Sequence, residues 1–123
     1  MKKKVFVSFD YREDNDKKGS LIAQAENSAS PFTIVDFSLQ EAAPDHLWLR
    51  KAQSAIDRCD IFIVILGHNT HQAPGVLKEV AIAKGLRKPR FQLKSQGTDP
   101  ERVKDAGPVV NWTWPKLQRI LSH

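Results

Sequence analysis

Residues 57–70 read DRCDIFIVILGHNT, and this stretch decides the fold. Its centre, from Ile61 to Leu66, is the longest uninterrupted aliphatic or aromatic run in the chain. A short apolar run between polar residues is typical of a strand that is buried on both faces, as in the middle of a parallel sheet. We therefore expect a central strand over residues 60–66, followed at once by a polar loop.

Shorter β-branched runs recur on both sides of this strand and alternate with stretches of helical period. The runs predict further strands over residues 3–9, 32–37 and 89–94, with a very short strand at 109–110. The helical period predicts helices over residues 17–28, 46–58 and 74–86, and a last helix that begins with Thr113 as its N-cap. Pro74, Gly85 and Pro89 lie where helices usually start and stop. The alternation indicates an α/β fold.

Right-handed crossovers turn this alternation into a three-layer sandwich, with helices on both faces of a parallel sheet of about five strands. The simplest strand order is the flavodoxin-like 2-1-3-4-5. A chain of 123 residues forms a single domain, here residues 1–123. Ligands in such sheets bind beyond the carboxyl ends of the strands, where the strand order reverses. The loops to examine are therefore residues 10–16, 38–45 and 67–73.

The composition is that of an ordinary globular protein, with 41% hydrophobic and 27% charged residues. No apolar run approaches the roughly 20 residues needed to cross a bilayer, and the basic start lacks the apolar segment of a signal peptide. We therefore expect a cytoplasmic protein with no membrane partner. The single cysteine, Cys59, allows no internal disulfide.

The net charge of +5 is unevenly distributed along the chain. Residues 84–123 hold nine Lys and Arg against three Asp and Glu, and they carry the whole excess. A basic surface can steer an anionic ligand, but in a small protein such residues usually only interact with solvent. We do not expect a nucleic-acid partner.

The loop after the first strand contains Asp10, Glu13, Asp14 and Asp16 within seven residues. Acidic clusters can bind Mg²⁺, as in phosphorelay receiver domains. A receiver also needs an aspartate at the end of the third strand, where this chain has Leu66-Gly67-His68. The receiver function is therefore not favoured. We expect Glu13 and Asp14 to be solvated or to cap the next helix.

The loop after the third strand begins with Gly67, where backbone could approach a ligand closely. His68 and His71 suggest a metal site, but no third ligand has suitable spacing, so we expect no metal. His68 and Asn69 are candidate ligand-facing polar groups.

Glu79 interrupts an apolar arc on the helix that follows the third strand. On a helical wheel it falls among Val76, Ile82, Ala83 and Leu86, and the positions four residues away, Gly75 and Ala83, are not cationic. An ionised carboxylate among apolar neighbours is costly. Either Glu79 lies at the rim of the arc and reaches water or a distant arginine, or it has a functional role.

Three stretches together resemble the Toll/interleukin-1 receptor (TIR) domain superfamily, and within it the compact TIR-like proteins of the bacterial Thoeris antiphage system. They are VFVSFDYREDND at 5–16, DRCDIFIVILGHNT at 57–70 and GVLKEVAIAKGLRKPRF at 75–91. In this resemblance Glu79 matches the catalytic glutamate. Gly75 and Val76 stand where many TIR domains have a tryptophan, and SLQEAAPDHLW after the second strand differs from the long loop of receptor TIR domains.

The resemblance implies a signalling enzyme that cleaves the N-glycosidic bond of NAD⁺, releasing nicotinamide and ADP-ribose or a cyclised signal nucleotide. NAD⁺ would be the substrate, and no cofactor is expected. The implied partners are NAD⁺ or a related nucleotide, with self-association or an effector protein for activation. Besides Glu79, the candidate substrate-binding residues are Phe9, Asp10, Tyr11, Ser38, Trp48, Gly67, His68 and Asn69. The aromatic ones could stack on a ring, but Phe9 and Trp48 could instead pack in the core.

Two alternatives remain open. A catalytically silent TIR-like module would use the same fold for protein interaction, with Glu79 as a structural residue. A nucleoside deoxyribosyltransferase-like enzyme also uses a glutamate on this kind of scaffold for N-glycosidic chemistry.

Overall fold

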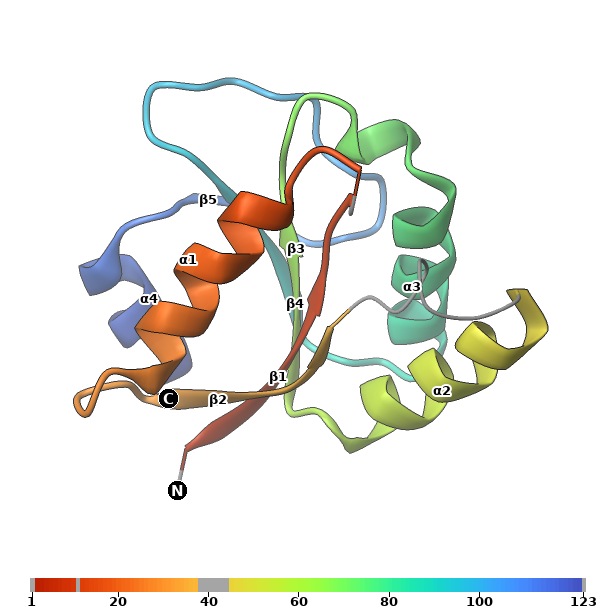
Figure 1. The fold of residues 1–123 in the computed structure, drawn as a ribbon, viewed down its shortest axis with the longest axis horizontal. Coiled ribbons are helices and arrows are strands. Elements are labelled where there is room, and N and C mark those ends of the chain that lie inside the picture. The colour runs from red at the N-terminus through yellow and green to blue at the C-terminus, as the bar shows by residue number, and fades with distance from the viewer. Residues whose placement is uncertain (1, 11, 38–44, 123) are drawn as a thin grey trace.

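The computed structural model describes residues 2–10, 12–37 and 45–122 (Figure 1). The strands are β1 (Lys3–Ser8), β2 (Phe32–Phe37), β3 (Ile61–Ile65), β4 (Arg90–Lys94) and β5 (Val109–Asn111). The helices are α1 (Asn15–Glu26), α2 (Asp45–Arg58), α3 (Pro74–Gly85) and α4 (Trp114–Leu121), with a 3-10 turn, η1 (Thr70–Gln72), before α3. The alternation of strands and helices predicted from the sequence is confirmed.

The five strands form one sheet in the order β2-β1-β3-β4-β5, and every adjacent pair is parallel. This confirms the predicted order. Chain order reverses between β1 and β3, where Phe6 lies opposite Phe62. The carboxyl ends of these two strands therefore border the crevice in which such sheets bind ligands.

Alternation along β1 assigns its residues to the two faces of the sheet. Val5, Val7 and Phe9 pack in the cluster that contains residues of α1 and α4. Phe6 packs in the cluster of α2 and α3, where its ring stacks on that of Phe62 with centroids 5.5 Å apart. Figure 1 shows α1 and α4 on one side of the sheet and α2 and α3 on the other. The three-layer arrangement follows from this alternation.

β3 is buried along its whole length, which explains why its sequence is uninterrupted IFIVI. Ile61, Ile63 and Ile65 face one helical layer, while Phe62 and Val64 face the other. The strand contributes to both halves of the core. The prediction that this stretch lies at the centre of the sheet is confirmed.

Some predicted boundaries were wrong. α1 begins at Asn15 rather than at residue 17, and it ends at Glu26 rather than at residue 28. The turn η1 was not predicted, because its three residues, Thr70–Gln72, have no apolar period.

A long connection from β4 to β5 is fixed by the buried side chain of Gln92. Its amide nitrogen donates to the carbonyls of Val103 and Gly107, at 3.0 and 2.7 Å, and its oxygen accepts from the Val103 amide at 2.7 Å. Gly107 has φ +85°, and a Cβ there would lie 2.1 Å from the Arg90 carbonyl oxygen. Only glycine fits this close approach.

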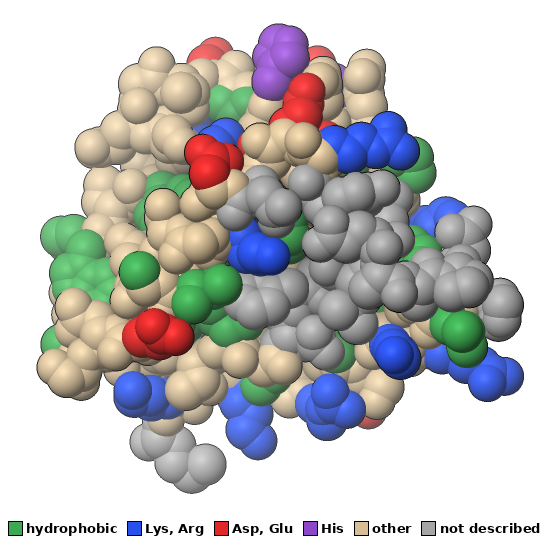
Figure 2. Space-filling view, viewed as in Figure 1, with side chains coloured by type: hydrophobic (Ala, Val, Ile, Leu, Met, Phe, Trp, Pro, Cys, Tyr) green, Lys and Arg blue, Asp and Glu red, His purple; other side chains and the backbone are tan. Residues whose placement is uncertain are grey.

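The two ends of the described chain meet at the amino end of the sheet. Lys2, Lys3 and Lys4 line one hollow together with Leu121 and Ser122. Figure 2 shows Lys and Arg side chains along this end, and acidic and histidine side chains at the opposite end. Among the described residues, no helix is both long and apolar enough to span a membrane.

Candidate functional site

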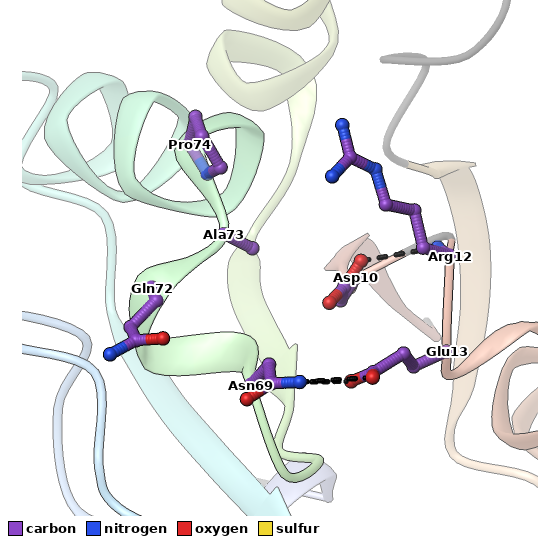
Figure 3. Close-up of a pocket in the computed structure, with 7 residues that line it drawn as sticks. All are labelled: Asp10, Arg12, Glu13, Asn69, Gln72, Ala73 and Pro74. Atoms are coloured by element: carbon purple, nitrogen blue, oxygen red, sulfur yellow. Dashed lines mark hydrogen bonds between the residues drawn. The ribbon is translucent and has the colours of Figure 1, made fainter.

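A cavity of about 250 Å³ opens at the carboxyl end of the sheet, between the loop after β1 and the start of α3 (Figure 3). Its lining residues are Asp10, Arg12, Glu13, Asn69, Gln72, Ala73 and Pro74. The first three come from the loop after β1 and the others from the segment after β3. The cavity therefore lies at the predicted point of strand-order reversal.

The loop after β1 turns tightly around Asp10. The Asp10 carboxylate accepts from the Arg12 amide at 3.1 Å, and its carbonyl accepts from the amides of Glu13 and Asp14 at 3.2 and 2.8 Å. An aspartate that bonds the backbone two residues on is a common turn-forming arrangement. Asp10 is 8% exposed. Its carboxylate holds the turn, and the residue also lines the cavity.

One side-chain contact joins the two loops across the crevice. The Asn69 amide donates to both carboxylate oxygens of Glu13, at 2.9 and 3.0 Å (Figure 3). Glu13 is exposed, in agreement with the prediction that it is solvated. Its bond to Asn69 connects the two loops across the crevice.

Asp14 is buried, at 2% exposure, so the expectation of a solvated or capping side chain is wrong. It occupies the N-cap position of α1 but makes no side-chain capping bond there. Its carboxylate pairs with Lys17 at 3.1 Å and accepts from the Thr70 hydroxyl at 3.3 Å. Burial raises the pKa of Asp14, while the Lys17 ammonium opposes that shift.

Gly67 is required by this buried carboxylate. A Cβ at Gly67 would lie 2.3 Å from the Asp14 carboxylate oxygens. The Gly67 amide donates to the Thr70 hydroxyl at 2.6 Å, so Thr70 binds both the glycine and Asp14. The sequence suggested that Gly67 leaves room for a ligand, and in the structure that room is occupied by Asp14.

Glu79 lies inside the molecule, not at an exposed rim of α3. The residue has 0% exposure, and its Oε1 accepts a hydrogen bond from the Ser8 hydroxyl at 2.7 Å. Ser8 is the last residue of β1 and is also 0% exposed. The carboxylate is thus held at the carboxyl end of the strand that borders the crevice.

The structure brings only some of the predicted site residues together. Asp10 and Asn69 line the 250 Å³ cavity, whereas Gly67 and His68 line a second cavity of about 340 Å³ with Lys17. Phe9 and Trp48, each 1% exposed, pack in the core on opposite faces of the sheet. Tyr11 and Ser38 lie outside the described residues.

Sequence reasoning did not assign several groups at this end of the sheet. Gln72, Ala73 and Pro74 form one wall of the cavity, and Ser8 and Thr70 bind the two buried carboxylates. The signal for Ser8 was available, because it is the one polar residue that ends the apolar run of β1. Among the described residues, no group of three His, Cys, Asp or Glu side chains could hold a metal ion.

Residues 6–97 match the family model described as Thoeris protein ThsB, TIR-like domain. This region runs from the second half of β1 to beyond the end of β4 and therefore includes both sides of the crevice. No curated protein sequence matches the chain.

Solved structures with a similar fold include an N-glycosidase and a desoxiribosyltransferase. A CMP N-glycosidase of Clostridium botulinum, BcmB, is similar with a TM-score of 0.60 and 20% identity, covering 96% of this chain and 98% of the other. A 2-desoxiribosyltransferase from Leishmania mexicana is similar with a TM-score of 0.58 and 14% identity, covering 85% and 76% of the two chains. At these identities the likeness shows the α/β fold alone.

Proposed function

Because the chain belongs to the family of Thoeris ThsB proteins with a TIR-like domain, we propose that it cleaves the bond between nicotinamide and ribose in NAD⁺. The observation that carries the proposal is the Glu79 carboxylate, buried at the carboxyl end of β1 and bound by the Ser8 hydroxyl. A carboxylate placed there requires a reason, since an ionised group is costly to bury.

The chemistry needs one anionic group. The bond from the nicotinamide nitrogen to the ribose anomeric carbon breaks, and its electron pair neutralises the pyridinium nitrogen, so no general acid is required. The ribose becomes an oxocarbenium ion, whose positive charge the Glu79 carboxylate would stabilise. Water, or a hydroxyl of the same nucleotide, then bonds to the anomeric carbon and loses a proton. The products are ADP-ribose or a cyclised nucleotide.

The burial of Glu79 sets a requirement on this mechanism. The cavity wall ends at Pro74, and Glu79 lies five residues further along α3, which corresponds to a rise of roughly 7.5 Å. The cavity of about 250 Å³ is also smaller than a typical ligand pocket of about 300–1,000 Å³. Substrate binding must therefore open a path from the cavity to the carboxylate.

The fold is compatible with such chemistry. The Clostridium botulinum protein of the same fold is named as a CMP N-glycosidase, an enzyme of N-glycosidic bonds. Family membership supports the choice of NAD⁺ over CMP for this chain, through the match of residues 6–97.

The test is nicotinamide release from NAD⁺ by the concentrated, purified protein, compared with Glu79→Gln. We expect the substitution to lower the rate by about 10²–10³, because it removes the charge and keeps the shape. Glu26→Gln, at an exposed position of α1, is the matched control and should leave the rate unchanged. Equal release by wild type and Glu79→Gln would contradict the proposed mechanism.

A second candidate function is favoured by one observation. Glu79 is fully buried and is not among the residues that line the described cavities. Both properties are expected of a glutamate with a purely structural role. A catalytically silent interaction module would release no nicotinamide at any protein concentration. It would also lose stability on Glu79→Gln, since the Ser8 bond would be weakened.

The deoxyribosyltransferase-like alternative differs in substrate. Wild type and Glu79→Gln should therefore also be incubated with CMP and with deoxynucleosides, and the release of free base should be measured. Release of base from these compounds but not from NAD⁺ would replace the NAD⁺ proposal.

A further inference from the structure

The serine that ends β1 is an unusual residue for its position. Its strand contributes Val5, Phe6 and Val7 to the core, and each of these side chains has 0% exposure, as Ser8 does. A small apolar residue would fill this place without a polar group to satisfy. The hydroxyl therefore needs an explanation in terms of what it binds.

The alternation of β1 aims this hydroxyl at α3. Ser8 shares its face of the strand with Phe6, which packs in the α2 and α3 layer. On that side its hydroxyl donates to Glu79 Oε1 at 2.7 Å, across 71 residues of sequence. This distance is the usual length of an O–H···O hydrogen bond, so the hydroxyl and the carboxyl group are in direct contact.

We infer that Ser8 is the positioning residue of the glycosidic reaction, holding the Glu79 carboxylate in one orientation. The inference rests on the proposed function, since it assigns Ser8 a role in that reaction. Stabilisation of an oxocarbenium ion depends on a carboxylate that is already oriented towards the position where the charge develops. Binding at Oε1 also limits rotation of the carboxylate about its last torsion, which is otherwise broad.

The hydroxyl of Thr70, the first residue of η1, does not duplicate this contact. The Thr70 hydroxyl accepts from the Gly67 amide and donates to Asp14. The two buried carboxylates at this end of the sheet thus have separate hydroxyl partners. Loss of Ser8 should affect Glu79 and leave the Asp14 cluster intact.

The test measures kcat and KM for NAD⁺ separately, on the full chain, by nicotinamide release. Ser8→Ala should lower kcat about tenfold or more and change KM by less than about twofold, because the residue acts on the carboxylate and not on the substrate. Ser8→Thr and Ser8→Val form a matched pair with the same shape, of which only threonine keeps the hydroxyl. Threonine should retain most of the activity that valine loses.

Ser30→Ala is the control for loss of a buried serine. Ser30 is 4% exposed, and its hydroxyl bonds only the backbone of Phe32 among the described residues, at the start of β2 and far from the cavity. It should destabilise the protein without changing kcat, and thermal unfolding of each variant shows which ones are folded.

The outcomes separate the two proposals. An active wild type with equal kcat for Ser8→Thr and Ser8→Val, or a loss confined to KM, would overturn the role of Ser8 and leave the proposed function standing. A folded wild type that releases no nicotinamide would overturn the proposed function, and the role of Ser8 with it.

Discussion

At the scale of single residues, the two buried carboxylates of the candidate site differ in their partners. Glu79 accepts a hydrogen bond from the Ser8 hydroxyl, and Asp14 pairs with the Lys17 ammonium and accepts from the Thr70 hydroxyl. Burial nevertheless raises the pKa of Asp14 above its ordinary value of 3.8. The ionised form of Asp14 is therefore less favourable in the folded chain than in the unfolded one.

The raised pKa of Asp14 predicts a pH-dependent stability. As pH falls from neutral through the folded-state pKa towards 3.8, the folded protein binds a proton before the unfolded chain does, so folding is favoured. The stability of wild type relative to Asp14→Asn, which cannot titrate there, should rise over this window and level off below it. Urea unfolding at several pH values measures this difference.

Asp16→Asn is the control for that series, because Asp16 is exposed in the first turn of α1. The raised pKa would be contradicted if the stability of wild type relative to Asp14→Asn stayed constant as the pH was lowered, or if it decreased.

At the scale of helices and strands, the sequence was sufficient to predict an element wherever its apolar pattern was long. The IFIVI run of β3 is buried as predicted, and the helix predicted over residues 46–58 forms as α2 with Ala52, Ala55 and Ile56 buried. Apolar residues recur at the positions of an element that face the core, and this pattern can be read from a single sequence. The strand order followed from the general rules of crossover and reversal.

The site was less predictable because its contacts join distant segments. The Ser8–Glu79 bond spans 71 residues and the Asp14–Thr70 bond 56, and neither leaves a local pattern. The burial of Asp14 is an example, since an aspartate before a helix normally indicates a cap. Only the packing of Asp14 against Gly67 shows why it is buried.

Gln92 in β4 provides a prediction at this scale, because three hydrogen bonds connect it to Val103 and Gly107. Gln92→Leu would leave these backbone groups without the side-chain partner, at a cost of about 2–4 kcal/mol in the free energy of unfolding. The β4–β5 connection should also loosen, so trypsin should cleave faster at Arg102 and Lys104.

Gln53→Leu, at an exposed position of α2, is the matched control and should change the unfolding free energy by less than about 0.5 kcal/mol. Unchanged stability and unchanged proteolysis in Gln92→Leu would show that the connection is held by other contacts.

At the scale of the whole molecule, the two halves of the core share one sheet. Cys59 lies in the α2 and α3 layer, and Trp112 and Trp114 pack against the α1 and α4 layer. β3 contributes side chains to both layers. If β3 left one half of the core, the apolar side chains of the other half would be exposed as well. The two halves of the core should therefore unfold together.

This cooperativity can be measured with one probe in each layer. In Trp48→Phe, the remaining tryptophans report on the α1 and α4 side, and Cys59 reports on the other. Burial raises the pKa of the Cys59 thiol, so the thiol should react with labelling reagents only after unfolding. The urea midpoints from tryptophan fluorescence and from thiol labelling should coincide, and separate midpoints would contradict shared unfolding.

The meeting of Lys2 and Ser122 in one hollow has a practical consequence. Both lie at the end of the sheet remote from the cavity of Asp10 and Asn69. A tether attached at Lys2 or Ser122 should immobilise the molecule with its crevice facing the bulk solution. A short peptide joining Ser122 to Lys2 should likewise permit circular permutation of residues 2–122, with new ends cut elsewhere on the surface.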